Sequence, residues 1–343
     1  MRRTQISKIF FGSVAAGLIA NGFAIAAVQD PRPEPPMPAS AKAHYDRARA
    51  IAAGDPDLQF WMRRSDFCMS PMAHDVFADN ISRAVMKPAK IADNLYLVGT
   101  GHVNTWILKT SAGLVLFDTM HNTQEAKDLI EGGIRELGLN PADIKYIFLT
   151  HGHTDHWGGA RYLQDKYKIP VATGDWDFLL ADPVKRTAPG SPPDDPQAAP
   201  AKPVKDVVLT DGQTVTIGDV TIKHISTPGH TPNTSSYIIP VKVNGVVHNF
   251  AMWGGTNFPR NQAGLSKFHD SLHVFWNAAS ADHAESLINP HAFFYDAFEK
   301  IEAAKTARTN PFLMGEDKVQ RTLAMQDECF GALWGWFNVL GYK

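Results

Sequence analysis

The chain has 343 residues, of which 44% are hydrophobic and 20% charged, so it can bury one large core or two fused halves. Its formal net charge is −2 at pH 7, and lysine and arginine are scattered along the sequence. This charge pattern excludes the basic surface that nucleic-acid binding requires. We therefore expect the partner to be a small-molecule substrate.

Residues 1–26 have the pattern of an export signal. Arg2, Arg3 and Lys8 precede an apolar run that ends in Ala24-Ile25-Ala26, the small-residue pattern of a signal-peptidase site. A retained membrane anchor is the alternative, because the run is nearly long enough to span a bilayer. Glycine and asparagine within the run favour cleavage. We therefore expect a periplasmic or secreted protein with no stable membrane association after the signal is removed.

The two cysteines are Cys68 and Cys329. In an oxidising compartment they could form a disulfide that joins the two ends of the chain, and two unpaired buried thiols are the alternative. With only two cysteines, a thiolate-rich zinc site is excluded.

A Pro-rich linker and an N-terminal helical extension are predicted for residues 27–90. The stretch 28–40 (VQDPRPEPPMPAS) cannot form a helix or a central strand, and an irregular helical pattern follows it. Residues 91–343 are predicted to form the main domain. Within it, residues 181–204 are rich in proline and predict a loop or flap.

Hydrophobic periodicity predicts the elements of the main domain. In the first half we expect strands at 92–100 and 144–150, a two-stranded hairpin at 105–120 and a helix at 124–137. The Asn244-Gly245 dipeptide predicts a tight hairpin turn between two further strands. The remaining elements of the second half are predicted strands at 207–210, 214–217, 220–226 and 285–289, and helices at 266–281, 294–307 and 316–340.

The stretch 151-HGHTDH-156 follows a predicted buried strand and carries four metal-binding side chains. His151 and His153 lie two residues apart on an extended loop, so they can point to the same side. Asp155 and His156 point another way and begin a second half-site. A catalytic zinc ion takes three protein ligands and leaves a position for water, so two ions need two more ligands.

Two more histidines follow strands in the second half. His230 lies in the glycine-opened turn 227-TPGHTPNTS-235. For the last ligand we prefer His291, which follows the strand at 285–289, over His283, which lies in a polar connection. The other histidines are predicted to be surface or satisfied core residues, including His224, His248, His269 and His273.

From about Asp93 onward, the chain resembles the metallo-β-lactamase superfamily. The matching features are H-x-H-x-D-H at 151–156, Asp118 at the end of GLVLFDT, GHT at 229–231 and a final histidine after a strand. The resemblance implies an α+β fold, a four-layer αβ/βα sandwich with two Zn²⁺ ions between the sheet edges. It assigns the metal ligands in two groups, His151, His153 and His230 for one ion and Asp155, His156 and His291 for the other.

One departure narrows the resemblance. Other branches carry a bridging aspartate or a cysteine on the strand after the GHT loop, where this sequence has Gly254-Gly255. The chain therefore looks most like the third subclass of metallo-β-lactamases, which implies hydrolysis of a β-lactam. Asp155 is the expected catalytic residue, because it can orient the attacking hydroxide and pass a proton to the leaving group.

Three residues are predicted to line the substrate groove: Trp157, His121 and Phe258. Core packing is the alternative for Trp157, and we expect Trp176 and Trp253 in the core. Other activities are also compatible with the motifs: a lactone or other ester hydrolase, an iron-dependent oxidoreductase, or a zinc-binding protein without catalysis.

Overall fold

The computed structural model describes residues 36–64, 68, 70–71, 73, 81–181 and 200–343. The predicted export signal at 1–26, most of the linker at 28–40 and most of the loop at 181–204 lie outside these residues. In the part of the chain that is described, no helix has both the length and the apolar composition needed to cross a bilayer.

Two mixed β-sheets form the centre of the fold. The first sheet has the order β1-β2-β3-β4-β5-β6-β7, antiparallel from β1 to β4 and parallel from β4 to β7. Its strands are β1 (Ala89–Lys90), β2 (Leu95–Gly99), β3 (Asn104–Thr110), β4 (Gly113–Phe117), β5 (Ile144–Phe148), β6 (Val171–Thr173) and β7 (Val207–Val208). The second sheet has the order β12-β11-β10-β9-β8, in which β11 and β12 are parallel and the other neighbours antiparallel. Its strands are β8 (Thr214–Ile217), β9 (Val220–Ser226), β10 (Ser235–Val243), β11 (Val246–Met252) and β12 (Ala284–Ile288).

Side chains of successive strand residues enter different hydrophobic layers. Val115 and Phe117 of β4 pack between the two sheets, whereas Leu114 and Leu116 pack on the outer face of the first sheet. The Phe117 ring lies 5.4 Å from the ring of Tyr237 on β10, which joins the two sheets. Because successive side chains point to opposite faces, each central strand contributes to two cores.

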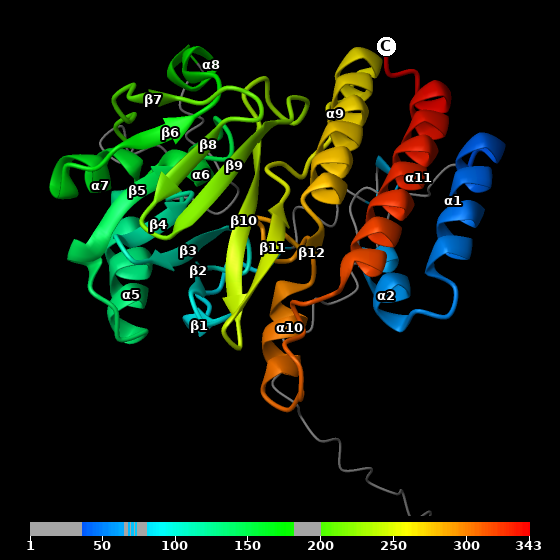
Figure 1. Ribbon diagram of the computed structural model, residues 1–343. Helices are drawn as coiled ribbons and strands as arrows, with labels where there is room; N and C mark the ends of the chain where they lie inside the picture. The colour runs from blue at the N-terminus through cyan, green and yellow to red at the C-terminus, as the bar shows by residue number, and fades with distance from the viewer. Residues whose placement is uncertain (1–35, 65–67, 69, 72, 74–80, 182–199) are drawn as a thin grey trace, which may run out of the picture.

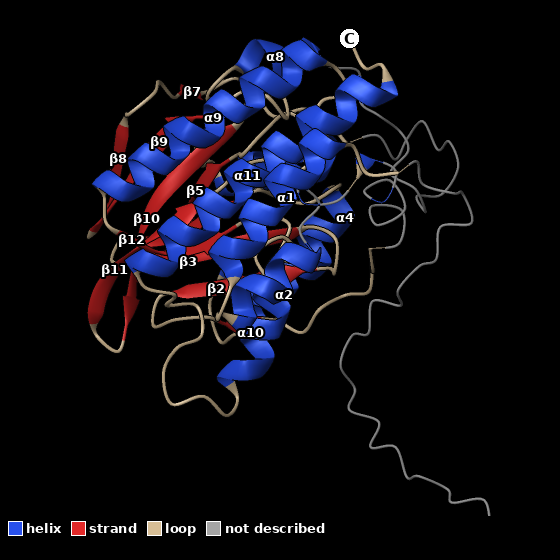
Figure 2. Cartoon of the chain, turned by 90° about the vertical axis from the view of Figure 1, so that its right-hand side faces the viewer, coloured by secondary structure: helices blue, strands red, loops and turns tan. Residues whose placement is uncertain are grey.

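Helices cover both outer faces. On the first sheet these are α4 (Thr123–Glu125), a π-helical segment (Ala126–Glu131), α5 (Gly132–Glu136), a 3₁₀ turn (Pro141–Asp143), α6 (Thr154–Trp157), α7 (Ala160–Tyr167) and α8 (Trp176–Ala181). The remaining helices are α1 (Ala39–Ala52), α2 (Pro56–Arg64), α9 (Gln262–Ala281), α10 (Ala297–Ala304) and α11 (Glu316–Leu340). Figure 1 shows α9, α11 and α1 side by side on the flank opposite α5 and α7, and Figure 2 shows them in front of the strands. The predicted α+β, four-layer αβ/βα sandwich is confirmed.

One detail distinguishes the structure from the expected order of elements, and one predicted turn is confirmed. The predicted strand at 207–210 is the short β7, which pairs with β6 of the first sheet although β8 and β9, next in sequence, belong to the second. The Asn244-Gly245 turn forms as predicted, with φ values of 51° and 80° in the left-handed region that this dipeptide tolerates.

The N-terminal extension is part of the helical layer on the second sheet. Cys68 and Cys329 form a disulfide with a Cα–Cα distance of 4.7 Å, which ties the segment after α2 to α11. Trp61 of α2 is buried, and its Nε1–H donates to the Phe294 carbonyl (2.8 Å). Lys318 of α11 pairs with Asp57 at 2.8 Å. The alternative of two free thiols is therefore wrong for this structure.

Replacing Cys68 and Cys329 together with serine should lower the free energy of unfolding by about 2–4 kcal/mol, because the cross-link restricts the unfolded chain. Guanidinium denaturation of metal-free protein measures this loss. A reducing agent should destabilise the wild type equally and leave the double variant unchanged. Identical midpoints for oxidised and reduced wild type would contradict the prediction.

Candidate metal centre

The first side chains of the candidate centre follow neighbouring strands of the first sheet. Asp118 directly follows β4, and His151 comes three residues after the end of β5. These two strands are parallel, with Phe117 opposite Phe148, so their carboxyl ends meet at one edge. Asp155 and His156 lie on α6, which begins immediately after the loop that carries His151. The edge of the sheet therefore gathers residues from both half-sites of the motif.

His151, His153 and His230 form the first ligand group. The Nε2 atoms of His151 and His230 are 3.1 Å apart. The His153 ring lies 4.9 Å from that of His151 and 4.7 Å from that of His230, nearly perpendicular to both. Residues 79 positions apart in sequence thus present imidazole nitrogens to one point.

Asp155, His156 and His291 form the second group. The Nε2 atoms of His156 and His291 are 3.1 Å apart, and Asp155 Oδ2 lies 3.4 Å and 3.9 Å from them. His291 is buried at 5% exposure. His283 instead lies on the surface, where it pairs with Glu316 (3.0 Å). Of the two candidates for the last ligand, the structure brings only His291 to the site.

Four imidazoles of the two groups have their Nδ1 atoms bonded to oxygen acceptors. The Nδ1–H groups of His151, His230 and His291 donate to the carbonyls of Gly254 (2.9 Å), Asn257 (2.7 Å) and His102 (2.7 Å), and that of His156 donates to Asp118 (2.6 Å). Such a bond fixes the tautomer and leaves the Nε2 lone pair for a metal. The four rings are therefore oriented as metal ligands.

The spacing fits zinc. With Zn–N bonds of 2.0–2.1 Å in a tetrahedron, two ligating nitrogens lie roughly 3.3 Å apart. The two Nε2–Nε2 separations of 3.1 Å are close to this value. Imidazole and carboxylate are also ligand types that zinc accepts. Both groups consequently fit a divalent ion of this kind.

Asp118 orients the His156 ring of the second group through the ring nitrogen that faces away from the metal position. Its carboxylate is fully buried and accepts hydrogen bonds from Thr150 N–H (2.7 Å), Thr150 Oγ1–H (2.7 Å) and His156 Nδ1–H (2.6 Å). Thr119 N–H binds the carbonyl of His156 at 2.7 Å. Asp118 thus holds both the end of β5 and a ligand ring in place.

Electrostatics distinguish His156 from the other buried imidazoles. Burial lowers the pKa of His230 to about 3, and burial with neighbouring imidazoles lowers those of His151 and His291, so these rings are neutral, as ligands must be. Burial opposes the charge of His156, but the carboxylates of Asp155 and Asp118 outweigh it and raise its pKa to about 10. Burial likewise opposes ionisation of Asp155, whose pKa His156 and His291 lower.

Glycines at 254 and 255 are required by space. A Cβ at Gly255 would lie 2.6 Å from His230 Cβ, and one at Gly254 would lie within 3 Å of the Ser235 backbone. The strand end that lacks a bridging carboxylate therefore has no room for one. The close approach also lets the Gly254 carbonyl reach His151.

Gly255→Ala should displace His230 and weaken metal binding at the first group, on the order of tenfold or more, as when a ligand loses its orientation. Titration of chelator-stripped protein with Zn²⁺ measures the change. Gly132→Ala is the matched control, because its nearest neighbour lies 3.8 Å from the added Cβ. Equal affinities for the two variants would show that the space at residue 255 is unimportant.

His291→Ala should lower the metal content by one ion per chain, whereas His283→Ala should leave it unchanged. The reason is that only His291 faces Asp155 and His156. Metal analysis after desalting tests both variants, and the opposite pattern would show that His283 supplies the ligand.

Two of the predicted groove residues are core residues. Trp157 is 1% exposed, and its Nε1–H donates to the Gly152 carbonyl (2.8 Å) in the outer layer of the first sheet. Phe258 is 4% exposed and packs against Phe337 of α11. The prediction that they line a substrate groove is wrong, because each ring is covered by a hydrophobic cluster. Trp176 and Trp253 are buried as expected.

His121 lies beside the metal groups, and His102 was missed by the sequence reasoning. His102, His121 and Asp155 form a further group of possible ligands. Burial lowers the pKa of His102 to about 4. No motif surrounds His102, and the signal that places it is topological: β2 runs in the same direction as β4, so the loop after β2 reaches the same sheet edge as Asp118.

The other histidines of the second half are satisfied elsewhere. His269 and His273 of α9 each lie 2.6 Å from Asp327 of α11, and His248 pairs with Glu285. His224 is buried, and its two ring nitrogens are bonded to the Thr210 carbonyl (2.8 Å) and to Ser235 Oγ (2.9 Å). It belongs to neither ligand group.

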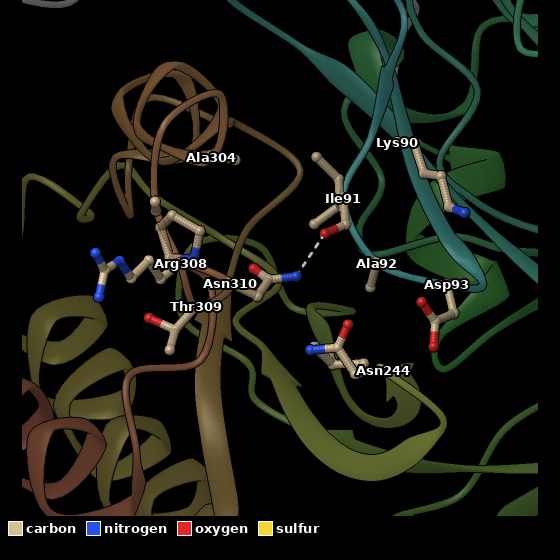
Figure 3. A pocket seen from close by; sticks show the side chains of 12 residues that line it. Lys90, Ile91, Ala92, Asp93, Asn244, Ala304, Arg308, Thr309 and Asn310 are labelled. Atoms are coloured by element: carbon tan, nitrogen blue, oxygen red, sulfur yellow. Dashed lines mark hydrogen bonds between the residues drawn. The ribbon is translucent and has the colours of Figure 1, made fainter.

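A pocket of about 270 Å³ lies between the β1–β2 turn, the β10–β11 hairpin and the loop after α10, and no metal-group residue lines it (Figure 3). Asn310 points to Ile91 and donates to its carbonyl (2.7 Å), while the Asp93 carboxylate accepts Gly245 N–H (2.7 Å). These polar groups of the pocket thus connect backbone segments.

Comparison with known proteins agrees with this geometry. Residues 98–243 match the family model of the metallo-beta-lactamase superfamily. The crystal structure of BJP-1, a subclass B3 metallo-beta-lactamase of Bradyrhizobium japonicum, is similar with a TM-score of 0.60 and 27% identity, covering 77% of this chain and 99% of that one.

Curated relatives match over shorter regions. Glyoxylase B2 of Dictyostelium discoideum is 34% identical over 122 residues, which are 34% of this chain and 38% of that protein. A hydroxyacylglutathione hydrolase of Rhodopseudomonas palustris is 34% identical over 93 residues, 27% of this chain and 28% of that protein. The chain thus spans well under half the length of these relatives.

Proposed function

We propose that this chain, a hydrolase of the metallo-β-lactamase superfamily, is an exported enzyme that uses two zinc ions to open the cyclic amide of a β-lactam. The observation that carries the proposal is the pair of ligand groups, in which imidazole Nε2 atoms 3.1 Å apart converge while their Nδ1 atoms are bonded to protein oxygens. With Nδ1 protonated and bonded, each ring directs the lone pair of its Nε2 atom towards a position that a metal ion can occupy.

Zinc is favoured by the ligand types. The two groups contain His151, His153, His230, Asp155, His156 and His291, which give five imidazoles and one carboxylate. Iron in oxygen-activating enzymes takes two histidines and one carboxylate, a set that the second group alone also has. The first group has no carboxylate, and Gly254 and Gly255 leave no room for a bridging one. Iron with an oxygen-consuming activity would therefore refute the proposal.

The metal ions and the residues that hold them would have different roles in hydrolysis. When bound, the two ions lower the pKa of coordinated water towards about 7 and stabilise negative charge on the carbonyl oxygen. His151, His156 and His291 are buried, so these ligand rings are shielded from bulk solvent. Asp155 is the carboxylate at the site, and we assign it the transfer of a proton from the attacking water to the leaving nitrogen.

The substrate class is supported by overall similarity. BJP-1 matches over 99% of its own length, whereas the glyoxylase and the hydroxyacylglutathione hydrolase match over about a third of theirs. A lactone or other ester remains the second candidate, because one of those relatives is a hydroxyacylglutathione hydrolase and no β-lactamase. The Cys68–Cys329 disulfide supports export, because such bonds persist in oxidising compartments.

Asp155→Ala should keep the fold and lower turnover by about 10²–10⁴-fold, the range for losing a group that transfers protons, while weakening the second ligand group. Circular dichroism, metal analysis and steady-state rates measure the three effects. Asp165→Ala, which removes an exposed partner of Arg161, is the matched control. Near-normal turnover in Asp155→Ala would contradict the assigned role.

The substrate class is tested with purified protein and a panel of penicillin, cephalosporin, carbapenem, lactone and thioester compounds, with and without chelator. We expect β-lactam hydrolysis that chelator abolishes and Zn²⁺ restores. Faster cleavage of the esters would replace the first candidate with the second. Activity that survives complete metal removal would refute both.

A further inference from the structure

Two imidazole nitrogens beside the second ligand group have no protein partner. Among the described residues, His102 Nδ1 and His121 Nε2 are buried without a hydrogen bond. Leaving such an atom buried without a partner destabilises the folded state. Native structures contain few of these atoms, and two in one cluster indicate a bound group that supplies their partner.

The two rings are arranged around Asp155. One ligand atom each from His102, His121 and Asp155 lie within 4.8 Å of one another. The His102 and His121 rings are stacked with centroids 5.9 Å apart, and the His102 ring lies 5.0 Å from that of His291. The cluster is therefore contiguous with the second ligand group.

The His121 ring has the hydrogen bonding of a metal-bound imidazole. Its Nδ1 lies 2.8 Å from Glu125 Oε2, which also accepts the His121 backbone N–H at 3.1 Å. The backbone of Glu125 is held in turn, because its N–H donates to Asn122 Oδ1 at the start of α4 (2.9 Å). A carboxylate bound to one ring nitrogen directs the lone pair of the other towards a cation.

We propose that His102, His121 and Asp155 form a third metal position, which takes a zinc-like divalent cation and shares Asp155 with the second ligand group. A carboxylate has two oxygens with about four lone-pair sites, so Asp155 can serve both positions. Two imidazoles and a carboxylate are a complete protein ligand set for zinc with a water position left open.

A cation at this position also stabilises the neighbouring group. The His102 carbonyl accepts His291 Nδ1–H, so fixing the His102 ring fixes the residue that orients His291. Asp155 is held at the same time. The third position depends on the proposed function only through Asp155, and it does not depend on which bond the enzyme cleaves.

Zinc binding by substituted proteins tests the proposal. In His121→Asn the amide can occupy the place of Nδ1 near Glu125, but it does not reach the place of Nε2; in His102→Gln the amide does not replace Nδ1. His283→Gln is the matched control, since His283 is exposed and paired with Glu316. Chelator-stripped proteins are titrated with Zn²⁺ alone, and bound zinc is counted by metal analysis and calorimetry.

We expect three zinc ions per chain in the wild type and the control, and two in each of His121→Asn and His102→Gln. The same zinc count in wild type and both variants would overturn the proposal. Two zinc ions in the wild type, the control and both variants would refute the third position and leave the two ligand groups of the proposed function intact. Fewer than two ions in all four proteins would refute the third position and the two-zinc function together. If the two variants bind as much zinc as the wild type but have a raised KM for the hydrolysed substrate, the His102 and His121 rings bind substrate, and the third metal position is refuted.

A second measurement needs no substitution. In crystals of the wild type grown with Zn²⁺, anomalous diffraction at the zinc absorption edge should give a peak beside His121 Nε2 and Asp155, separate from those of the other two groups. Absence of this peak from crystals that show the other two would overturn the proposal even if a variant failed to fold.

Discussion

The buried carboxylate of Asp118 is the interaction on which the rest of the metal centre depends. It lies at the end of β4 with a left-handed φ of 64° and accepts three hydrogen bonds, two from Thr150 and one from His156. Leaving a buried charge without these partners would cost several kcal/mol, so the carboxylate and its donors fix one another. One side chain thereby sets the spacing of two parallel strand ends and the direction of a metal-ligand ring.

Three other ligand rings are held by backbone carbonyls from the second half of the chain and from the loop after β2. Carbonyls of Gly254, Asn257 and His102 accept the Nδ1–H groups of three imidazoles. The helical layer takes part as well, because Ser271 of α9 donates to the Pro228 carbonyl (2.6 Å) in the loop that carries His230. Packing of helices on the second sheet therefore contributes to the geometry of a site that lies at the sheet edges.

Close packing at the edge of the sheets explains why a bridging side chain is absent from the metal centre and why two further histidines lie beside it. Gly254 and Gly255 lie against Ser235 and His230, so the position that carries a bridging side chain in other branches is filled by backbone and imidazole. Meanwhile the loop after β2 and the loop after β4 bring His102 and His121 to the other side of Asp155. The site thus lacks the bridging aspartate or cysteine of other branches. It has two imidazoles, those of His102 and His121, in addition to the six ligands that the motifs predict.

Local sequence determined those features that depend on short-range geometry. The spacing within 151-HGHTDH-156 defined two half-sites, the Asn244-Gly245 dipeptide defined a hairpin turn, and apolar periodicity defined the closing helix at 316–340. Strand ends also pointed to His230 and favoured His291 over His283. These inferences succeed because spacing, turn preference and periodicity act over a few residues.

Only the tertiary structure decided the features that depend on which surfaces meet. It paired Cys68 with Cys329 across 261 positions and buried Trp157 and Phe258 in hydrophobic clusters. It also brought His102 to Asp155, although nothing local marks that histidine as different from those bonded elsewhere. An aromatic or imidazole side chain has the same local pattern in a core and at a site, so its role is set by the packing of distant segments.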